Sequence, residues 1–183
     1  MGKYEFTDEI KVVNGIALHR IKAITDFGNV KAGELGGFIK KRANLSDEGN
    51  AWVYGNAEVS GNAEVYGDAR VFGNAEVSDN AEVFGDARVC GDARVYGDAR
   101  VCDNAEVCGD ADYICIKGLG SEYRNTTFYN NKKGGVSVCC GCFYGTLDEF
   151  AAKVKETHAD NVYAKEYLAA VEVVKIHFGI KDD

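Results

Sequence analysis

The chain has 183 residues, of which 46% are hydrophobic, and a formal net charge of −8. This composition is typical of a folded protein and argues against disorder. The charge is uneven, because residues 51–112 hold thirteen Asp and Glu against four Arg, a balance of −9. Since duplex nucleic acids are bound through basic surface stripes, we expect no such partner here.

The N-terminus has no apolar stretch of the kind that forms a secretion signal, and no run of residues reaches the length of a membrane span. We therefore expect a cytoplasmic protein without a membrane partner. The seven Cys are an odd number. Without a secretion signal, that count predicts reduced thiols rather than a disulfide framework.

Residues 1–50 are predicted to form an N-terminal β cap and an irregular first coil. The segments 11–13 and 16–18 are apolar strands joined by Asn14-Gly15, a pair typical of a type I′ hairpin turn. A further short strand is expected at 21–24. The hexad pattern described next can be followed backwards to 37–39 and 43–45, and a two-residue insertion within 46–50 shifts its phase.

Ten consecutive hexads fill residues 51–110, each with Ala at position one and Val at position three. Positions five and six are Gly or Asp followed by Asn or Asp, residues that tolerate the left-handed backbone of tight corners. Strand alternation directs Ala and Val to one side and positions two and four to the other. A strict period of this kind indicates a solenoid, which we expect to span 51–116.

The hexads closely resemble those of the hexapeptide-repeat left-handed parallel β-helix. The resemblance implies 18-residue coils of three hexads each, left-handed winding and a homotrimer. Residues eighteen apart then stack in outward columns, and the aromatic members of these columns mark a contact surface. The columns at position four are Tyr54-Phe72-Cys90-Cys108, Tyr66-Phe84-Cys102 and Ser60-Ser78-Tyr96.

Residues 117–183 are predicted to form a small C-terminal ββαα domain. Strands are expected at 126–129 and 136–139, after a last solenoid strand at 113–116. Thr146 and Glu149 form the pattern of a capping box at the start of a helix, and a second helix follows Asp160-Asn161. The predicted buried stripes are Leu147, Phe150, Ala151 and Val154 in the first helix and Tyr163, Tyr167, Ala170, Val171, Val174 and Phe178 in the second.

The most site-like stretch is the Gly-led segment 120–127, which is followed by two aromatic residues. An Arg offers a planar fork for phosphate or carboxylate, and an aromatic ring offers a stacking face. The alternative is a structural loop in which Arg124 bonds to local carbonyls or to Glu122. The candidate ligand-binding residues are Tyr123, Arg124, Asn125, Thr127, Phe128, Tyr129, Phe143 and His158.

Two kinds of chemistry are alternatives to ligand binding. Acyltransferases of the hexapeptide-repeat type use a His beside the coils and an extruded loop, whereas His19, His158 and His177 lie outside the hexads and no hexad carries an insertion. The segment 139–142 with His158 is a candidate metal site, but its Cys spacing differs from CxxC and favours small buried thiols. We predict no catalytic residue, metal or cofactor, and leave open whether the protein is an enzyme.

A wider resemblance covers nearly the whole chain. The segments DFGNVKAGELGGFI (26–39), ANLSDEGNAWVYGNA (43–57) and CGCFYGTLDEFAAKVKETHADN (140–161) are similar to hexapeptide-repeat proteins of phages and prophages. This implies a phage-encoded accessory protein. The hypothesis is a non-enzymatic protein that holds a small anionic, nucleotide-like ligand between subunits and so sequesters a host immune signal. The alternatives are an acyltransferase and a structural or protein-binding module.

Overall fold

The computed structural model describes residues 2–181. The chain divides into two compact units, with the division between Asp110 and Ala111. Within the described residues, no helix is long and apolar enough to cross a membrane.

The N-terminal unit begins with the predicted hairpin. Strands β1 (Tyr4–Val13) and β2 (Ile16–Ala23) pair antiparallel. Asn14 and Gly15 adopt φ angles of 50° and 78°, as the type I′ turn requires. The hairpin is therefore confirmed, but the separate strand expected at 21–24 is wrong, because β2 continues through Ala23 without a break.

Strand β3 (Leu35–Ile39) joins this hairpin to the solenoid. It pairs antiparallel with β2 and parallel with the second hexad, through Phe38 and Glu58. The cap also covers the outward side chain of Trp52, whose ring lies 6.2 Å from that of Tyr4 and 5.3 Å from that of Phe27. Trp52 is fully buried as a result.

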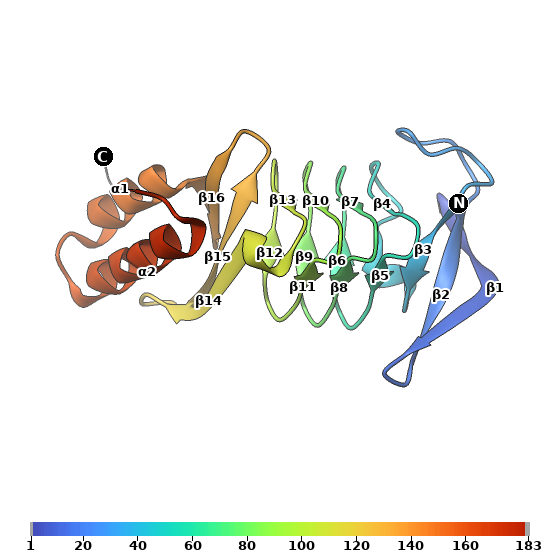
Figure 1. Ribbon diagram of the computed structural model, residues 1–183, viewed down its shortest axis with the longest axis horizontal. Coiled ribbons are helices and arrows are strands. Elements are labelled where there is room, and N and C mark those ends of the chain that lie inside the picture. Colours follow the sequence, from blue (N-terminus) through green and yellow to red (C-terminus); the bar gives the residue numbers. More distant parts are fainter. Residues whose placement is uncertain (1, 182–183) are drawn as a thin grey trace. The chain divides into compact units, whose positions relative to one another are not determined.

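The ten hexads form ten strands of two residues each, stacked in successive coils (Figure 1). They are β4 (Trp52–Val53), β5 (Glu58–Val59), β6 (Glu64–Val65), β7 (Arg70–Val71), β8 (Glu76–Val77), β9 (Glu82–Val83), β10 (Arg88–Val89), β11 (Arg94–Val95), β12 (Arg100–Val101) and β13 (Glu106–Val107). Strands eighteen residues apart pair in parallel and form three faces: β5-β8-β11, which continues from β3, β6-β9-β12, and β4-β7-β10-β13. Each hexad Ala and Val is fully buried. The protein is thus a β-solenoid with 18-residue coils, as predicted.

The predicted change of phase before Ala51 is also present. Phe38 pairs with Glu58 and Leu45 with Val65, so these partners are separated by twenty residues rather than eighteen. The two extra residues lie between the short 3₁₀ helix η1 (Arg42–Asn44) and β4. The Asn44 amide donates to the Ala63 carbonyl at 2.7 Å, which ties the irregular coil to the regular one.

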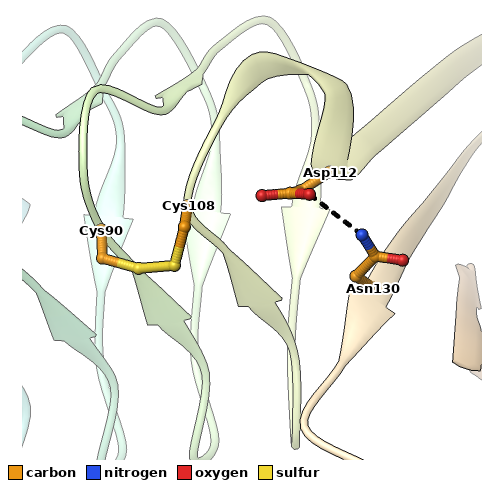
Figure 2. Close-up of a disulfide and its surroundings, with 4 residues drawn as sticks. All are labelled: Cys90, Cys108, Asp112 and Asn130. Carbon is orange, nitrogen blue, oxygen red and sulfur yellow. Dashed lines mark hydrogen bonds between the residues drawn. A yellow bond between two sulfur atoms is a disulfide. The ribbon is translucent and has the colours of Figure 1, made fainter. Parts of the chain in front are cut away.

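Coil stacking brings Cys90 and Cys108 together, with their Cα atoms 4.4 Å apart, and a disulfide links them (Figure 2). The prediction of reduced thiols is wrong for this pair. It rested on the odd Cys count, whereas the 18-residue period places these two residues within bridging distance. The other five Cys keep their thiols.

The C-terminal unit follows the second 3₁₀ turn, η2 (Asp110–Asp112). Its antiparallel sheet has the order β14 (Tyr113–Leu119), β15 (Arg124–Asn131), β16 (Gly135–Cys140) and β17 (Phe143–Thr146). Near the start of β14, the Asn130 amide donates to the Asp112 carboxylate at 3.0 Å (Figure 2). The segment 113–116 was predicted as the last strand of the solenoid, but it is wrong in that role, because it is part of β14, which pairs antiparallel with β15 in this sheet. The short strand β17, which contains Gly145, was not expected from the sequence.

Helices α1 (Leu147–His158) and α2 (Val162–Phe178) complete this unit. The predicted capping box is present, because Glu149 N–H donates to Thr146 Oγ1 and Thr146 N–H donates to the Glu149 carboxylate. Asn161 caps α2 by accepting from two backbone N–H groups. The core between helices and sheet contains Phe128, Val138, Phe150, Tyr167 and Val174. Of the predicted stripes, Ala151 and Phe178 are half-buried and Tyr163 is exposed.

Candidate ligand pocket

A pocket of about 430 Å³ lies within the C-terminal unit. Its walls come from the turn after β14, from the turn between β16 and β17, and from one side of α1. The lining residues are Ser121, Glu122, Arg124, Cys140, Cys142, Phe143, Phe150, Lys153, Val154, Thr157, His158 and Tyr167. The volume falls in the range of small-molecule sites.

Helix α2 holds the turn that carries Arg124. Gly120 has a φ of 72° and lies against the Tyr167 ring so closely that a side chain would overlap it. The Gly120 N–H donates to the Glu166 carboxylate at 2.7 Å, and the Tyr167 hydroxyl donates to the Leu119 carbonyl at 3.2 Å. These contacts fix the start of β15 and therefore the position of Arg124.

The second turn holds the Arg124 side chain itself. Gly141 has a φ of 59°, and the guanidinium of Arg124 occupies the space that a side chain at residue 141 would fill. Gly thus serves two purposes at this position, since it permits the left-handed backbone and it leaves room for Arg124.

Aromatic rings form the apolar part of the pocket. Phe150 lies 5.4 Å from Phe143 and 5.6 Å from Tyr167, measured between ring centroids. The His158 ring stacks on Tyr167 at 5.8 Å. Such contacts stabilise aromatic clusters beyond simple burial and leave a rigid surface on which a flat ligand could rest.

The Tyr167 hydroxyl remains a hydrogen-bond donor at physiological pH. Burial, followed by the neighbouring Cys140, raises the pKa of Tyr167 to about 12. The Cys140 thiol lies 3.9 Å from this hydroxyl and 3.2 Å from Thr126 Oγ1. Cys140 is therefore part of a buried polar contact that connects β15, β16 and α2.

The charged side chains of the pocket are mainly cationic. Arg124 and Lys153 carry positive charges, and Glu122 is the acidic residue among the lining side chains. Lys153 also bonds Glu156 at 3.0 Å, on the same helix. Because an Arg fork binds carboxylate and phosphate in a bidentate manner, the part of the pocket lined by Arg124 and Lys153 is suited to an anion.

The structure brings together three of the eight candidate residues: Arg124, Phe143 and His158. Strand alternation explains why some candidate residues of β15 do not line the pocket. Arg124, Thr126 and Phe128 share the face of β15 that packs on the helices. Asn125, Thr127 and Tyr129 belong to the opposite face.

The remaining five candidates occupy other environments. Tyr123 is 79% exposed in the turn, at a φ of 50°. Phe128 and Tyr129 are fully buried and Thr127 nearly so, and these three are therefore core residues rather than a stacking face for a ligand. The Asn125 Oδ1 atom is buried and accepts no hydrogen bond from residues 2–181.

Several pocket residues were not singled out from the sequence, although their spacing contains a signal. Lys153 and Thr157 recur with Phe150 and Val154 of the predicted buried stripe at intervals that place them on the same side of α1 as the predicted site residue His158. Once Phe150 is assigned to the buried stripe, His158 follows on the same side. The contribution of Tyr167 depends on how α2 packs, which sequence spacing alone does not give.

The segment 139–142 contributes thiols to the pocket rather than a closed metal cage. Cys140 is buried, and Cys142 lies exposed in the turn. Within residues 2–181, no group of three or more His, Cys, Asp and Glu side chains is placed to hold a metal ion.

Comparison with known proteins finds similarity in the repeats. A family model described as "YdcK Beta solenoid repeat" matches residues 87–109. The chain is also similar to the "Uncharacterized acetyltransferase YdcK" of Escherichia coli (strain K12), with 36% identity over 62 residues. The match covers 30% of this chain and 19% of that protein. The chain therefore spans about a fifth of the curated relative, and the similarity supports the β-solenoid repeat.

Proposed function

We propose that the C-terminal unit binds a small anionic ligand with a flat, nucleotide-like ring and does not transform it. The observation that carries this proposal is the joint placement of Arg124, Lys153 and His158 around an aromatic cluster in one pocket. The cationic groups suit phosphate or carboxylate, and Phe143 and Phe150 suit the ring.

We further propose that the protein is a homotrimer and that the ligand is held where its subunits meet, near the C-terminal unit. The resemblance of three long segments to phage and prophage proteins supports a role in sequestering a host immune signal. A binding protein of this kind needs affinity and slow release rather than a catalytic group.

Acetyl transfer is the second candidate, and the name of the Escherichia coli relative, an uncharacterised acetyltransferase, favours it. Coenzyme A is itself an anionic nucleotide, so it would suit the same pocket chemistry. His158 lines the pocket and is the residue that we would assign as the base in such a reaction.

Calorimetry and thermal shift against a panel test both candidates. The panel contains mononucleotides, cyclic mono- and dinucleotides, coenzyme A, acetyl-coenzyme A and inorganic phosphate. We expect a nucleotide to bind and Arg124→Ala to weaken it by about tenfold or more, with Arg124→Lys intermediate because it keeps the charge but loses the fork.

A matched pair of variants on α1 provides the control. Lys153→Ala removes a pocket cation, whereas Lys155→Ala removes an exposed cation outside the pocket. Only the first should weaken binding. Absence of binding to the whole panel, or binding that neither Arg124→Ala nor Lys153→Ala changes, would contradict the proposal. Turnover of acetyl-coenzyme A that is lost in His158→Ala would instead support acetyl transfer.

A further inference from the structure

On the β6-β9-β12 face of the solenoid, the outward side chains bond to one another. The Tyr66 and Phe84 rings stack at 4.9 Å between centroids, and the Arg100 guanidinium lies 5.1 Å from the Phe84 ring. The Glu82 carboxylate accepts from Arg100 at 3.1 Å and from the Tyr66 hydroxyl at 3.0 Å. The rings and charges of this group therefore have their partners within the chain.

The β4-β7-β10-β13 face carries two rings and two Arg residues that do not make such contacts. Tyr54 and Phe72 occupy position four of successive coils. Arg70 and Arg88 occupy position two, and they lie opposite each other on the paired strands β7 and β10. Within residues 2–181, neither Arg forms an ion pair or lies over a ring, and the two rings do not stack. Because like charges opposite each other destabilise a strand pair, an anion placed between the two Arg residues would be stabilising.

The four side chains surround a hollow. Tyr54, Arg70, Phe72 and Arg88 line a space of about 460 Å³, which we call the Arg face. Both Arg side chains are half-buried, and Phe72 is 36% exposed. Burial raises the pKa of Tyr54, so its hydroxyl stays protonated beside Arg70 and is available as a donor. The Arg face thus offers guanidinium and hydroxyl donors next to an open aromatic ring.

Carboxylates limit the length of a ligand at both ends of the Arg face. Glu106 lies opposite Arg88 on β13, although no ion pair joins the two side chains. Towards the N-terminal cap, Glu34 is close enough to Tyr54 to add to the rise in its pKa. An extended polyanion would meet these carboxylates, whereas a single phosphate group fits between them. The ligand is therefore short.

We propose that the Arg face binds a phosphate monoester carried on a flat, apolar ring. The phosphate lies between Arg70 and Arg88, whose planar forks suit its oxygens. The ring of the ligand packs on Phe72, stacked or edge to face. The phosphate dianion balances the two Arg charges, and the ring covers the exposed part of Phe72. The Arg face shares no lining residue with the pocket of the C-terminal unit, so the two sites are independent.

Ligand-observed NMR titration with phenyl phosphate tests this site. The full-length Arg124→Ala variant is the background, because it lacks the Arg of the C-terminal pocket. We expect phenyl phosphate to bind, and Arg70→Gln/Arg88→Gln to weaken binding by about tenfold or more. Arg94→Gln is the matched control, since Arg94 occupies position two on another face and pairs with Glu76 at 3.8 Å. This control should leave the affinity unchanged.

Two further variants test where the ligand lies. Phe72→Ala should weaken phenyl phosphate by about threefold or more, and it should leave the binding of inorganic phosphate unchanged because that probe has no ring. Glu106→Gln should strengthen the binding of both probes, since it removes the carboxylate opposite Arg88. Circular dichroism verifies that each variant is folded.

Loss of binding in the double Arg variant, with binding kept in Arg94→Gln, supports the proposal. The proposal is overturned if phenyl phosphate does not bind the Arg124→Ala chain, or if the double Arg variant binds it normally. Binding that Phe72→Ala leaves unchanged, or that Glu106→Gln weakens, also overturns it. Phosphotyrosine and adenosine monophosphate then distinguish a phosphorylated side chain from a mononucleotide as the source of the ester, and a preference for either supports the proposal.

Discussion

The solenoid and the C-terminal unit bury their residues in different ways. The hexads place the same two small side chains, Ala and Val, inside every coil, and backbone hydrogen bonds between coils repeat at an interval of eighteen residues. The C-terminal unit packs two helices on a four-stranded sheet around a varied aromatic core. A uniform core gives a regular prism whose outer faces carry columns of side chains, whereas the varied core leaves a concave pocket.

Glycine has a different role in each region. In the solenoid, Gly at position five permits the left-handed corner, and at Gly61, Gly73 and Gly91 an added side chain would overlap the backbone of the next coil. In the C-terminal unit, Gly120 and Gly141 also make room for Tyr167 and Arg124. Glycine thus makes room for the backbone of the next coil in one region and for side chains of the proposed binding site in the other. Four predictions test whether the two regions are as independent and as different as this comparison indicates.

The largest effect is expected from a charge inside the solenoid. Val77→Asp buries a carboxylate between Val59 and Val95 of the adjacent coils, and we expect a loss of about 5 kcal/mol or more in the free energy of unfolding. Ser78→Asp places the same group on the outer surface one residue later and should change stability by less than about 1 kcal/mol. Urea denaturation measures both. A mild effect of Val77→Asp would show that the coils tolerate local opening.

The second prediction concerns the core of the C-terminal unit. Phe150→Ala removes a ring that contacts Phe128, Phe143 and Tyr167, and should cost about 4 kcal/mol. Because the two units have separate cores, this unit should unfold first while the solenoid remains folded. Hydrogen exchange with mass spectrometry distinguishes unfolding of the C-terminal unit from unfolding of the solenoid. A single transition that exposes both units together would contradict their independence.

The regular core of the solenoid makes that region more predictable from the sequence than the C-terminal unit with its varied core. Ala and Val recur at a strict interval, so the strands, the stacking partners and even the two-residue phase shift near 46–50 could be derived from residue spacing alone. The pocket could be derived only in part. Arg124 and His158 were identified by chemical type, but Tyr167 reaches the pocket from α2 through tertiary packing that no local pattern specifies.

Phe128 and Tyr129 illustrate the opposite error. Their position after a Gly-led loop favoured a stacking role, yet both are fully buried. An aromatic residue in a central strand serves the core as readily as a ligand, and the difference depends on what covers each face of the sheet. Here four consecutive residues of β15, Thr126 to Tyr129, are all buried, so both faces of the strand contribute to burial.

The third prediction concerns the disulfide, which is specific to the solenoid. Cys90→Ser opens a covalent loop that spans one coil, and a loop of eighteen residues corresponds to a stabilisation of about 3 kcal/mol. We expect the solenoid transition to shift to a lower denaturant concentration and the C-terminal transition to remain unchanged. Addition of a reductant to the wild-type chain should reproduce the shift. Mass spectrometry without reduction would show whether Cys90 and Cys108 are linked at the outset, and their absence from any disulfide would refute the assignment.

The smallest stability effect, and the most informative for the site, is expected at Gly141. Gly141→Ala and Gly134→Ala both place a side chain on a left-handed backbone, at φ angles of 59° and 78°, and each should cost about 1 kcal/mol from that strain. At Gly134 nothing lies within 4 Å of the added carbon, whereas at Gly141 the carbon would displace the Arg124 guanidinium. Both variants should therefore lose similar stability in thermal denaturation, but only Gly141→Ala should also weaken ligand binding by as much as Arg124→Ala does. Equal binding by the two glycine variants would mean that the position of Arg124 does not matter, and that the pocket is selected by its shape rather than by its charge.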